Sequence, residues 1–239
     1  MIDVHPAPHA AHSWRDFFIH IATIAIGLLL ALGLEQTVEH FHRLHQRHGL
    51  EENLHSESLL NRRIVAYNVE SVAEVRRNIR LNMTNLDLNG KPFTPIPPAH
   101  DTFLPFIDTA WVVARGNGSL ALLPDQLAES YWKVDVLAQD AANSIQSLAN
   151  ARKKVNSLLY LHAKPSDLTV EERAALLRAY SEEDQELGNL NYILLAYRYM
   201  NEAVLAGRVP TVDDLAKESR DAQKTEAQPP RPQGLRPIQ

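Results

Sequence analysis

Hydrophobic residues gather first in one uninterrupted run near the N-terminus, from Phe17 to Leu34. These eighteen positions carry no formal charge, and eleven of them are Leu, Ile or Phe. At about 1.5 Å of rise per residue, a helix of this length reaches about 27 Å, close to the thickness of a bilayer's hydrocarbon core. The run predicts a transmembrane helix over residues 14–36, with Trp14 at one headgroup boundary and Glu35 at the other.

Two other interpretations of this run remain open. A cleavable signal peptide would use Ala31-Leu32-Gly33 as its small-residue cleavage site. However, the segment before the run is nearly uncharged, because Arg15 adjoins Asp16, and the helical pattern continues beyond the run without a break. A buried helix of a soluble protein is the third interpretation. We expect the uncleaved anchor.

Beyond the run, hydrophobic residues recur every three or four positions, which is typical of amphipathic helices. The spacing predicts helices over residues 50–88, 102–114, 124–162 and 169–206, and a shorter one over 211–219. Convincing strand-like alternation is absent from the sequence. In the first of these helices the predicted core stripe comprises Leu60, Ile64, Val72, Val75, Ile79, Met83 and Leu86, widened by Tyr67 and Val69.

Turn and capping residues separate the predicted helices. Residues 89–92, Asn-Gly-Lys-Pro, end the first, and the Gly-Asn-Gly of residues 116–118 predicts a connector. Pro124 suits a first helical turn, and Thr169 with Glu172 matches a capping box. The acidic run 181–186 reads as a solvated helix face.

Together these elements predict an all-α fold in which a single N-terminal transmembrane helix continues into an antiparallel bundle of long helices. The expected division is a disordered tail over residues 1–13, the transmembrane helix over 14–36, a helical bundle with its juxtamembrane helix over 37–220, and a disordered proline-rich tail over 221–239.

Charge and composition narrow the function classes. The net charge of −5 argues against a nucleic-acid partner, which needs a basic surface. Zero cysteines exclude disulfides and thiol chemistry. The sequence contains no nucleophile elbow, His-Glu-x-x-His motif or phosphate loop. We therefore expect no catalytic residues and no cofactor.

Small residues recur at four-residue steps within the apolar run, at Thr23, Gly27 and Ala31. Such a stripe lets two membrane helices approach closely. The expected partners are the lipid bilayer, a second copy of the chain through this stripe, and an unidentified protein.

Histidines follow the run. If the helix continues, His42, His45 and His48 recur at three-residue steps. Imidazoles one turn apart can chelate a transition metal, and they can also sense pH. A third interpretation is an interfacial collar that meets headgroups and water, and it is the one we expect.

Two stretches, residues 14–48 and 108–135, resemble a family of uncharacterised bacterial proteins with an N-terminal span and a helical domain. The family's Gly-x-x-x-Ala-Leu and Thr-x-Trp…Gly-x-Leu-x-Leu motifs fall on Gly27, Ala31 and Leu32, and on Thr109, Trp111, Gly118, Leu120 and Leu122. The resemblance implies packing residues and no activity.

The resemblance also bears on location. Relatives often carry a basic N-terminal tail, which implies a domain outside the cytoplasm, whereas this chain has only Arg15 there. Counted alone, Arg43 and Arg47 on the other side of the span favour a cytoplasmic domain. We expect a single-pass protein of the bacterial inner membrane with a periplasmic domain.

The expected function is a membrane-anchored, non-catalytic interaction or scaffold protein. The alternative is a sensor that binds a small molecule, protons or a metal and acts through a partner.

Overall fold

The computed structural model describes residues 14–88, 92–160, 162 and 164–209. The two predicted disordered tails, the predicted helix over 211–219 and most of the turn at 89–92 lie outside these residues. Within them the chain forms α-helices, short 3₁₀-helices and extended connections without any strand, so the predicted all-α class is confirmed. The residues fall into two compact units that divide between Gly49 and Leu50.

The first unit consists, in its described part, of the N-terminal part of α1, a helix that runs from Trp14 to Leu88. An 18-residue window of this helix has a mean hydropathy of 2.4, and none of that window is buried. Among the described residues, α1 is the one helix long and apolar enough to cross a membrane. Every side chain from Trp14 to Gln46 is exposed.

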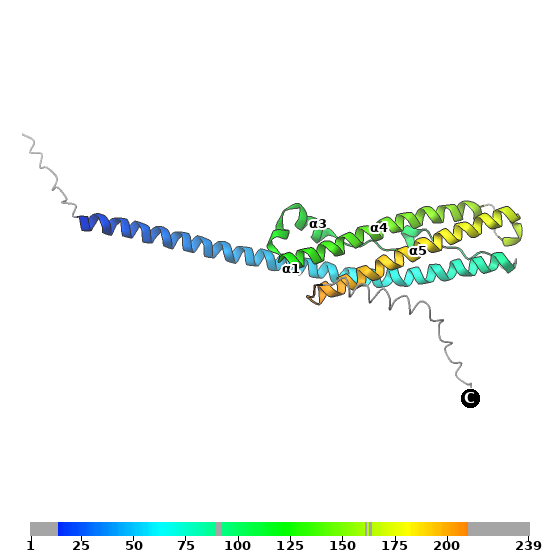
Figure 1. Cartoon of the computed structure of the whole chain (residues 1–239), viewed down its shortest axis with the longest axis horizontal. Coiled ribbons are helices and arrows are strands. Elements are labelled where there is room, and N and C mark those ends of the chain that lie inside the picture. Colours follow the sequence, from blue (N-terminus) through cyan, green and yellow to red (C-terminus); the bar gives the residue numbers. More distant parts are fainter. Residues whose placement is uncertain (1–13, 89–91, 161, 163, 210–239) are drawn as a thin grey trace, which may run out of the picture. The chain divides into compact units, whose positions relative to one another are not determined.

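The second unit is a bundle of three long helices, formed by residues 50–88 of α1, by α4 (Asp125–Leu159) and by α5 (Val170–Leu205) (Figure 1). The connections hold α2 (Ala99–Thr102), α3 (Thr109–Gly116), and the 3₁₀-helices η1 (Ser119–Leu122) and η2 (Pro165–Asp167). The predicted capping box at the start of α5 is confirmed, because Thr169 accepts from the Glu172 amide and Glu172 accepts from the Thr169 amide. Gly118 adopts a left-handed φ of 76°, as the predicted connector requires.

The core face of α1 follows a heptad pattern. Its buried positions alternate at steps of three and four residues: Leu54, Ser58, Asn61, Val65, Asn68, Val72, Val75, Ile79, Asn82 and Leu86. The second half of the predicted stripe is right. In the first half, Leu60 and Tyr67 are wrong because they are about half exposed, whereas Ile64 and Val69 are partly buried. Four of the buried positions are polar, so the spacing of hydrophobic residues alone did not indicate which face of α1 is buried.

Three of those buried residues, Asn61, Asn68 and Asn82, hold an extended segment that returns along α1. We call residues 92–108 the strap. Each asparagine donates its amide to a strap carbonyl and accepts from the backbone N–H of the same strap residue: Asn82 with Thr94, Asn68 with Leu104, and Asn61 with Ile107. The six distances lie between 2.6 and 2.9 Å.

The helix predicted over residues 102–114 is wrong in its first half, which belongs to the strap. Phe103 is extended, residues 104–108 form no helix, and α3 begins only at Thr109. Pro105 lacks an amide hydrogen and disfavours a helical residue before it. The neighbouring backbone groups of Leu104 and Ile107 find their partners in the asparagine side chains instead. Because the strap carries the chain back along α1, α4 runs in the same direction as α1, and α5 runs antiparallel to both (Figure 1).

Candidate functional site

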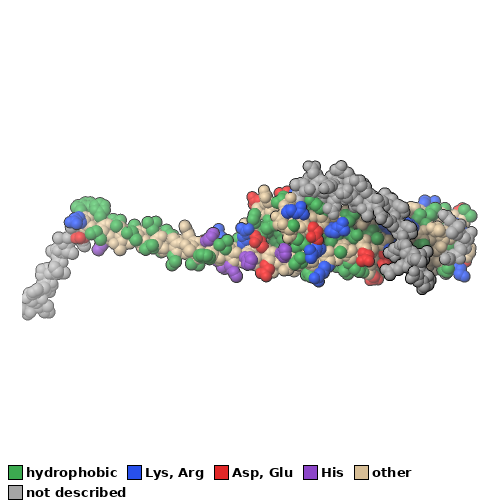
Figure 2. Space-filling view, turned by 90° about the horizontal axis from the view of Figure 1, so that it is seen from below, with side chains coloured by type: hydrophobic (Ala, Val, Ile, Leu, Met, Phe, Trp, Pro, Cys, Tyr) green, Lys and Arg blue, Asp and Glu red, His purple; other side chains and the backbone are tan. Residues whose placement is uncertain are grey.

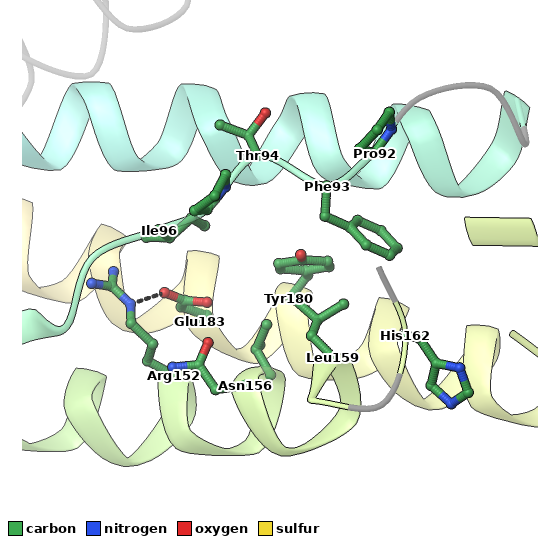
Figure 3. Close-up of a pocket in the computed structure, with 12 residues that line it drawn as sticks. Pro92, Phe93, Thr94, Ile96, Arg152, Asn156, Leu159, His162, Tyr180 and Glu183 are labelled. Carbon is green, nitrogen blue, oxygen red and sulfur yellow. Dashed lines mark hydrogen bonds and ion pairs between the residues drawn. The ribbon is translucent and has the colours of Figure 1, made fainter. Parts of the chain in front are cut away.

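A cavity of about 410 Å³ lies in the bundle where the strap passes over α4 and α5 (Figure 3). Its walls are mostly apolar, with Phe93 and Ile96 from the strap, Leu159 from α4 and Tyr180 from α5. The strap side of the cavity is held in place because the Asn82 side chain forms hydrogen bonds with the backbone C=O and N–H of Thr94.

A buried ion pair forms the polar end of the cavity. Arg152 of α4 donates through Nε to Oε1 of Glu183 on α5, at 2.6 Å, and through Nη1 to the carbonyl of Pro97 in the strap. Both side chains are almost wholly buried. One guanidinium therefore connects α4, α5 and the strap, with no net charge left at the site.

Burial raises the pKa of Glu183, and the neighbouring Arg152 guanidinium opposes that rise. Removing either partner leaves an unpaired charge out of water, which costs about 3–5 kcal/mol in comparable pairs. Tyr180 is fully buried beside this pair, and burial raises its pKa as well.

The rim of the cavity carries solvent-accessible polar groups. Asn156 is exposed, and His162 lies partly exposed with Nε2 3.3 Å from Oε1 of Glu172. Hydrogen bonds from Thr169 lower the pKa of Glu172, and the charge of His162 adds to that effect. The rim therefore offers an amide and an imidazole to a molecule that enters.

Sequence reasoning missed the ion pair. It assigned the acidic run 181–186 to a solvated face, but Glu183 is fully buried and Asp184 pairs with Arg76 at 2.9 Å. The available signal was register, because Glu183 falls between Tyr180 and Leu187 in the same sequence of three- and four-residue steps that buries Leu190 and Leu194.

The small residues predicted for self-association lie on the first unit. Thr23, Gly27 and Ala31 are all exposed, and the Thr23 hydroxyl donates to the carbonyl of Ile19 at 2.8 Å. A Cβ added at Gly27 would meet nothing within 4 Å, so this face of α1 is open.

The three candidate metal ligands are likewise exposed, but they do not share one direction. On one flank of α1, Nε2 of His42 lies 2.9 Å from Nε2 of Gln46. Nowhere in the described part of the chain do three His, Asp or Glu side chains converge as a metal ion would need. Metal binding by His42, His45 and His48 stays an untested alternative to the expected interfacial collar.

One face of the helix beyond the apolar run is uncharged. At about 100° per residue, Leu34, Val38, Phe41, His45 and His48 fall within an arc of about 80°, which we call the α1 seam. Gly27 and Ala31 continue the same face backwards at heptad spacing. The charged residues of this stretch, Glu35, Glu39, Arg43 and Arg47, follow one another at four-residue steps on the opposite side, where Glu39 and Arg43 form an ion pair.

The seam is open to solvent along its whole length. The exposed fractions of Leu34, Val38 and Phe41 are 69%, 63% and 65%. Figure 2 shows hydrophobic side chains along this part of α1, with histidines gathered toward its end. Large side chains exposed in a continuous row are typical of a surface that another molecule covers.

Comparisons of the chain with family models, with curated proteins and with solved structures find no match.

Proposed function

We propose that this protein is a single-pass, membrane-anchored, non-catalytic interaction module that pairs with a second copy of itself along the α1 seam. The observation that carries the proposal is the segregation of charge on α1. From Leu34 to His48 every Asp, Glu, Lys and Arg lies opposite a face of heptad-spaced uncharged residues. This pattern is typical of a helix that pairs with another helix.

Membrane anchoring supports a second copy as the occupant of the seam. Chains inserted with the same topology meet in parallel and at the same depth, so each seam residue faces its own counterpart. The row Gly27, Ala31 and Leu34 then continues the contact inside the bilayer, where small residues permit close approach.

Cysteine cross-linking tests the pairing directly, because the natural chain contains no cysteine. We expect Val38→Cys, on the seam, to form an intermolecular disulfide in native membranes. Its neighbour Glu39→Cys, on the charged face, should remain monomeric, since a disulfide needs Cβ atoms about 3.5–4.5 Å apart. Equal cross-linking at both positions, or none at either, would contradict the proposal.

A second variant probes the bilayer part of the contact. Gly27→Leu places a bulky side chain on the seam without adding charge, and the position is open enough to accept it. We expect less Val38→Cys cross-linking in this background, whereas Leu29→Ile, away from the seam, should leave it unchanged.

The anchor itself and its compartment have their own test. We propose a bacterial inner membrane, with the bundle on the periplasmic side, as the family resemblance implies. A topology reporter fused after Gln239 should be active only in its periplasmic form, and the protein should resist extraction with alkaline carbonate. A mature chain beginning near Leu34 would indicate signal cleavage and would contradict the anchor.

A second candidate function, a ligand-binding sensor, is favoured by the cavity at Arg152 and Glu183. Its fixed polar end and apolar walls resemble the make-up of small-molecule sites. In a thermal-unfolding screen of the full chain with small aromatic amides and acids, a ligand of this cavity should raise the melting temperature. The rim variant Asn156→Phe should abolish that rise, and a rise that survives it would place the ligand elsewhere.

A further inference from the structure

The geometry points to a metal site that two chains complete together: we propose that His45 and His48 of one chain and the same residues of a second copy bind one divalent transition metal ion, with Zn²⁺ the foremost candidate. The inference rests on the proposed pairing along the α1 seam and adds a ligand to it.

The two histidines sit at adjacent positions of the seam. They continue the three- and four-residue steps of Leu34, Val38 and Phe41, so they point in the same direction as the apolar side chains. In a parallel pair held in register by the membrane, His45 faces His45 and His48 faces His48. Three residues of helix separate the two layers by only about 4.5 Å.

Four imidazoles at this spacing provide the number and type of ligands that zinc favours. Zn²⁺ prefers tetrahedral coordination and binds imidazole nitrogen at about 2.0–2.1 Å. The layer before them is Phe41, an apolar residue that shields one side of the ion. Between Leu34 and His48 the carboxylates and guanidinium groups lie away from the seam, so they do not repel the cation at close range, whereas the Glu52 carboxylate follows His48 by four residues on the same face.

The described part of a single chain lacks such a site. It presents only two histidines on the seam, because His42 turns to a flank and contacts Gln46. This agrees with the finding that no metal-binding group of three side chains forms within the described residues of one chain. The partner copy therefore supplies half of the ligands.

The test measures zinc binding and pairing on the full chain in lipid nanodiscs or mild detergent, with Zn²⁺ as the only added metal. We expect about one Zn²⁺ per two chains and a dimer that dissociates about tenfold less readily with Zn²⁺ than with a chelator. His45→Ala and His48→Ala should each abolish the zinc effect. His40→Ala and His42→Ala, which lie off the seam, should preserve it.

Histidines elsewhere need a separate control. A background in which His5, His9 and His12 are replaced by Asn must retain the zinc effect. Persistence of the effect in His45→Ala would overturn the inference, and so would zinc binding that leaves pairing unchanged.

The experiment distinguishes failure of the proposed pairing from failure of the proposed metal site. Seam cross-linking that is unaffected by Zn²⁺ or by His45→Ala would overturn the metal site and leave the pairing intact. A monomer under both conditions would overturn both.

Discussion

Replacing Asn68 by Leu tests whether the asparagine ladder holds the strap. Asn68 is fully buried, and its amide makes two hydrogen bonds of 2.9 Å to the backbone of Leu104. Leucine has the same branched arrangement of side-chain heavy atoms and is somewhat larger, so the change removes the hydrogen bonds without leaving a cavity. We expect it to destabilise the bundle.

The magnitude follows from the two bonds. Each contributes about 0.5–1.5 kcal/mol net, and a backbone group left unpaired away from water costs about 1–3 kcal/mol. Solvent reaches this part of the strap, since the Leu104 side chain is 45% exposed, so water recovers part of the loss. We expect the free energy of unfolding to fall by about 2–3 kcal/mol.

Urea unfolding of the full chain in detergent, followed by tryptophan fluorescence, measures the loss. Trp111 is buried and reports on the bundle, whereas Trp14 and Trp132 are exposed in the folded state and change less. With a urea slope of about 2 kcal/mol/M, the midpoint should fall by about 1–1.5 M.

The matched control is Asn85→Leu, because Asn85 makes only one bond of 3.5 Å to the Pro92 carbonyl. That variant should stay within about 0.5 kcal/mol of the wild type. If Asn68→Leu were no more destabilising than Asn85→Leu, the strap would not depend on the ladder and the reasoning would be refuted.

Two further predictions concern buried charge. Arg152→Met should cost about 3–5 kcal/mol of unfolding free energy because Glu183 loses its partner, and adding Glu183→Leu should restore most of it; urea midpoints that simply add would refute this coupling. Burial raises the pKa of Glu57 above its ordinary value of 4.5, although its carboxylate accepts from the Ala110 amide at 2.7 Å. The folded state therefore holds this proton more firmly than the unfolded state, and stability should fall as pH rises from about 4.5 through the raised pKa. Melting temperatures of Glu57→Gln across that window should decline less steeply than those of the wild type.

Much of the fold could be predicted from periodicity. The sequence predicted helices over 124–162 and 169–206, and the structure places α4 at Asp125–Leu159 and α5 at Val170–Leu205. Long amphipathic patterns carry enough local information for this. The capping box at Thr169 succeeded for the same reason, since its partners are three residues apart.

The candidate cavity was beyond such reasoning. Glu183 lies thirty-one positions after Arg152 in the sequence, and Pro97 lies fifty-five positions before it. Local sequence therefore does not indicate that the three residues are in contact. The polarity of three asparagines also led to a wrong prediction of which α1 residues are buried. Asn61, Asn68 and Asn82 look like surface residues in a helix, yet all three are buried because the strap supplies backbone partners.

The sequence by itself determined the long helices, their approximate ends, and the apolar run with its uncharged continuation, because each depends on residues within a few turns of one another. Only the tertiary structure decided which polar side chains enter the core. A buried amide or charge needs a hydrogen-bonding partner, and for Asn61, Asn68, Asn82 and Glu183 a distant segment supplies it, so the condition is met in space rather than along the chain.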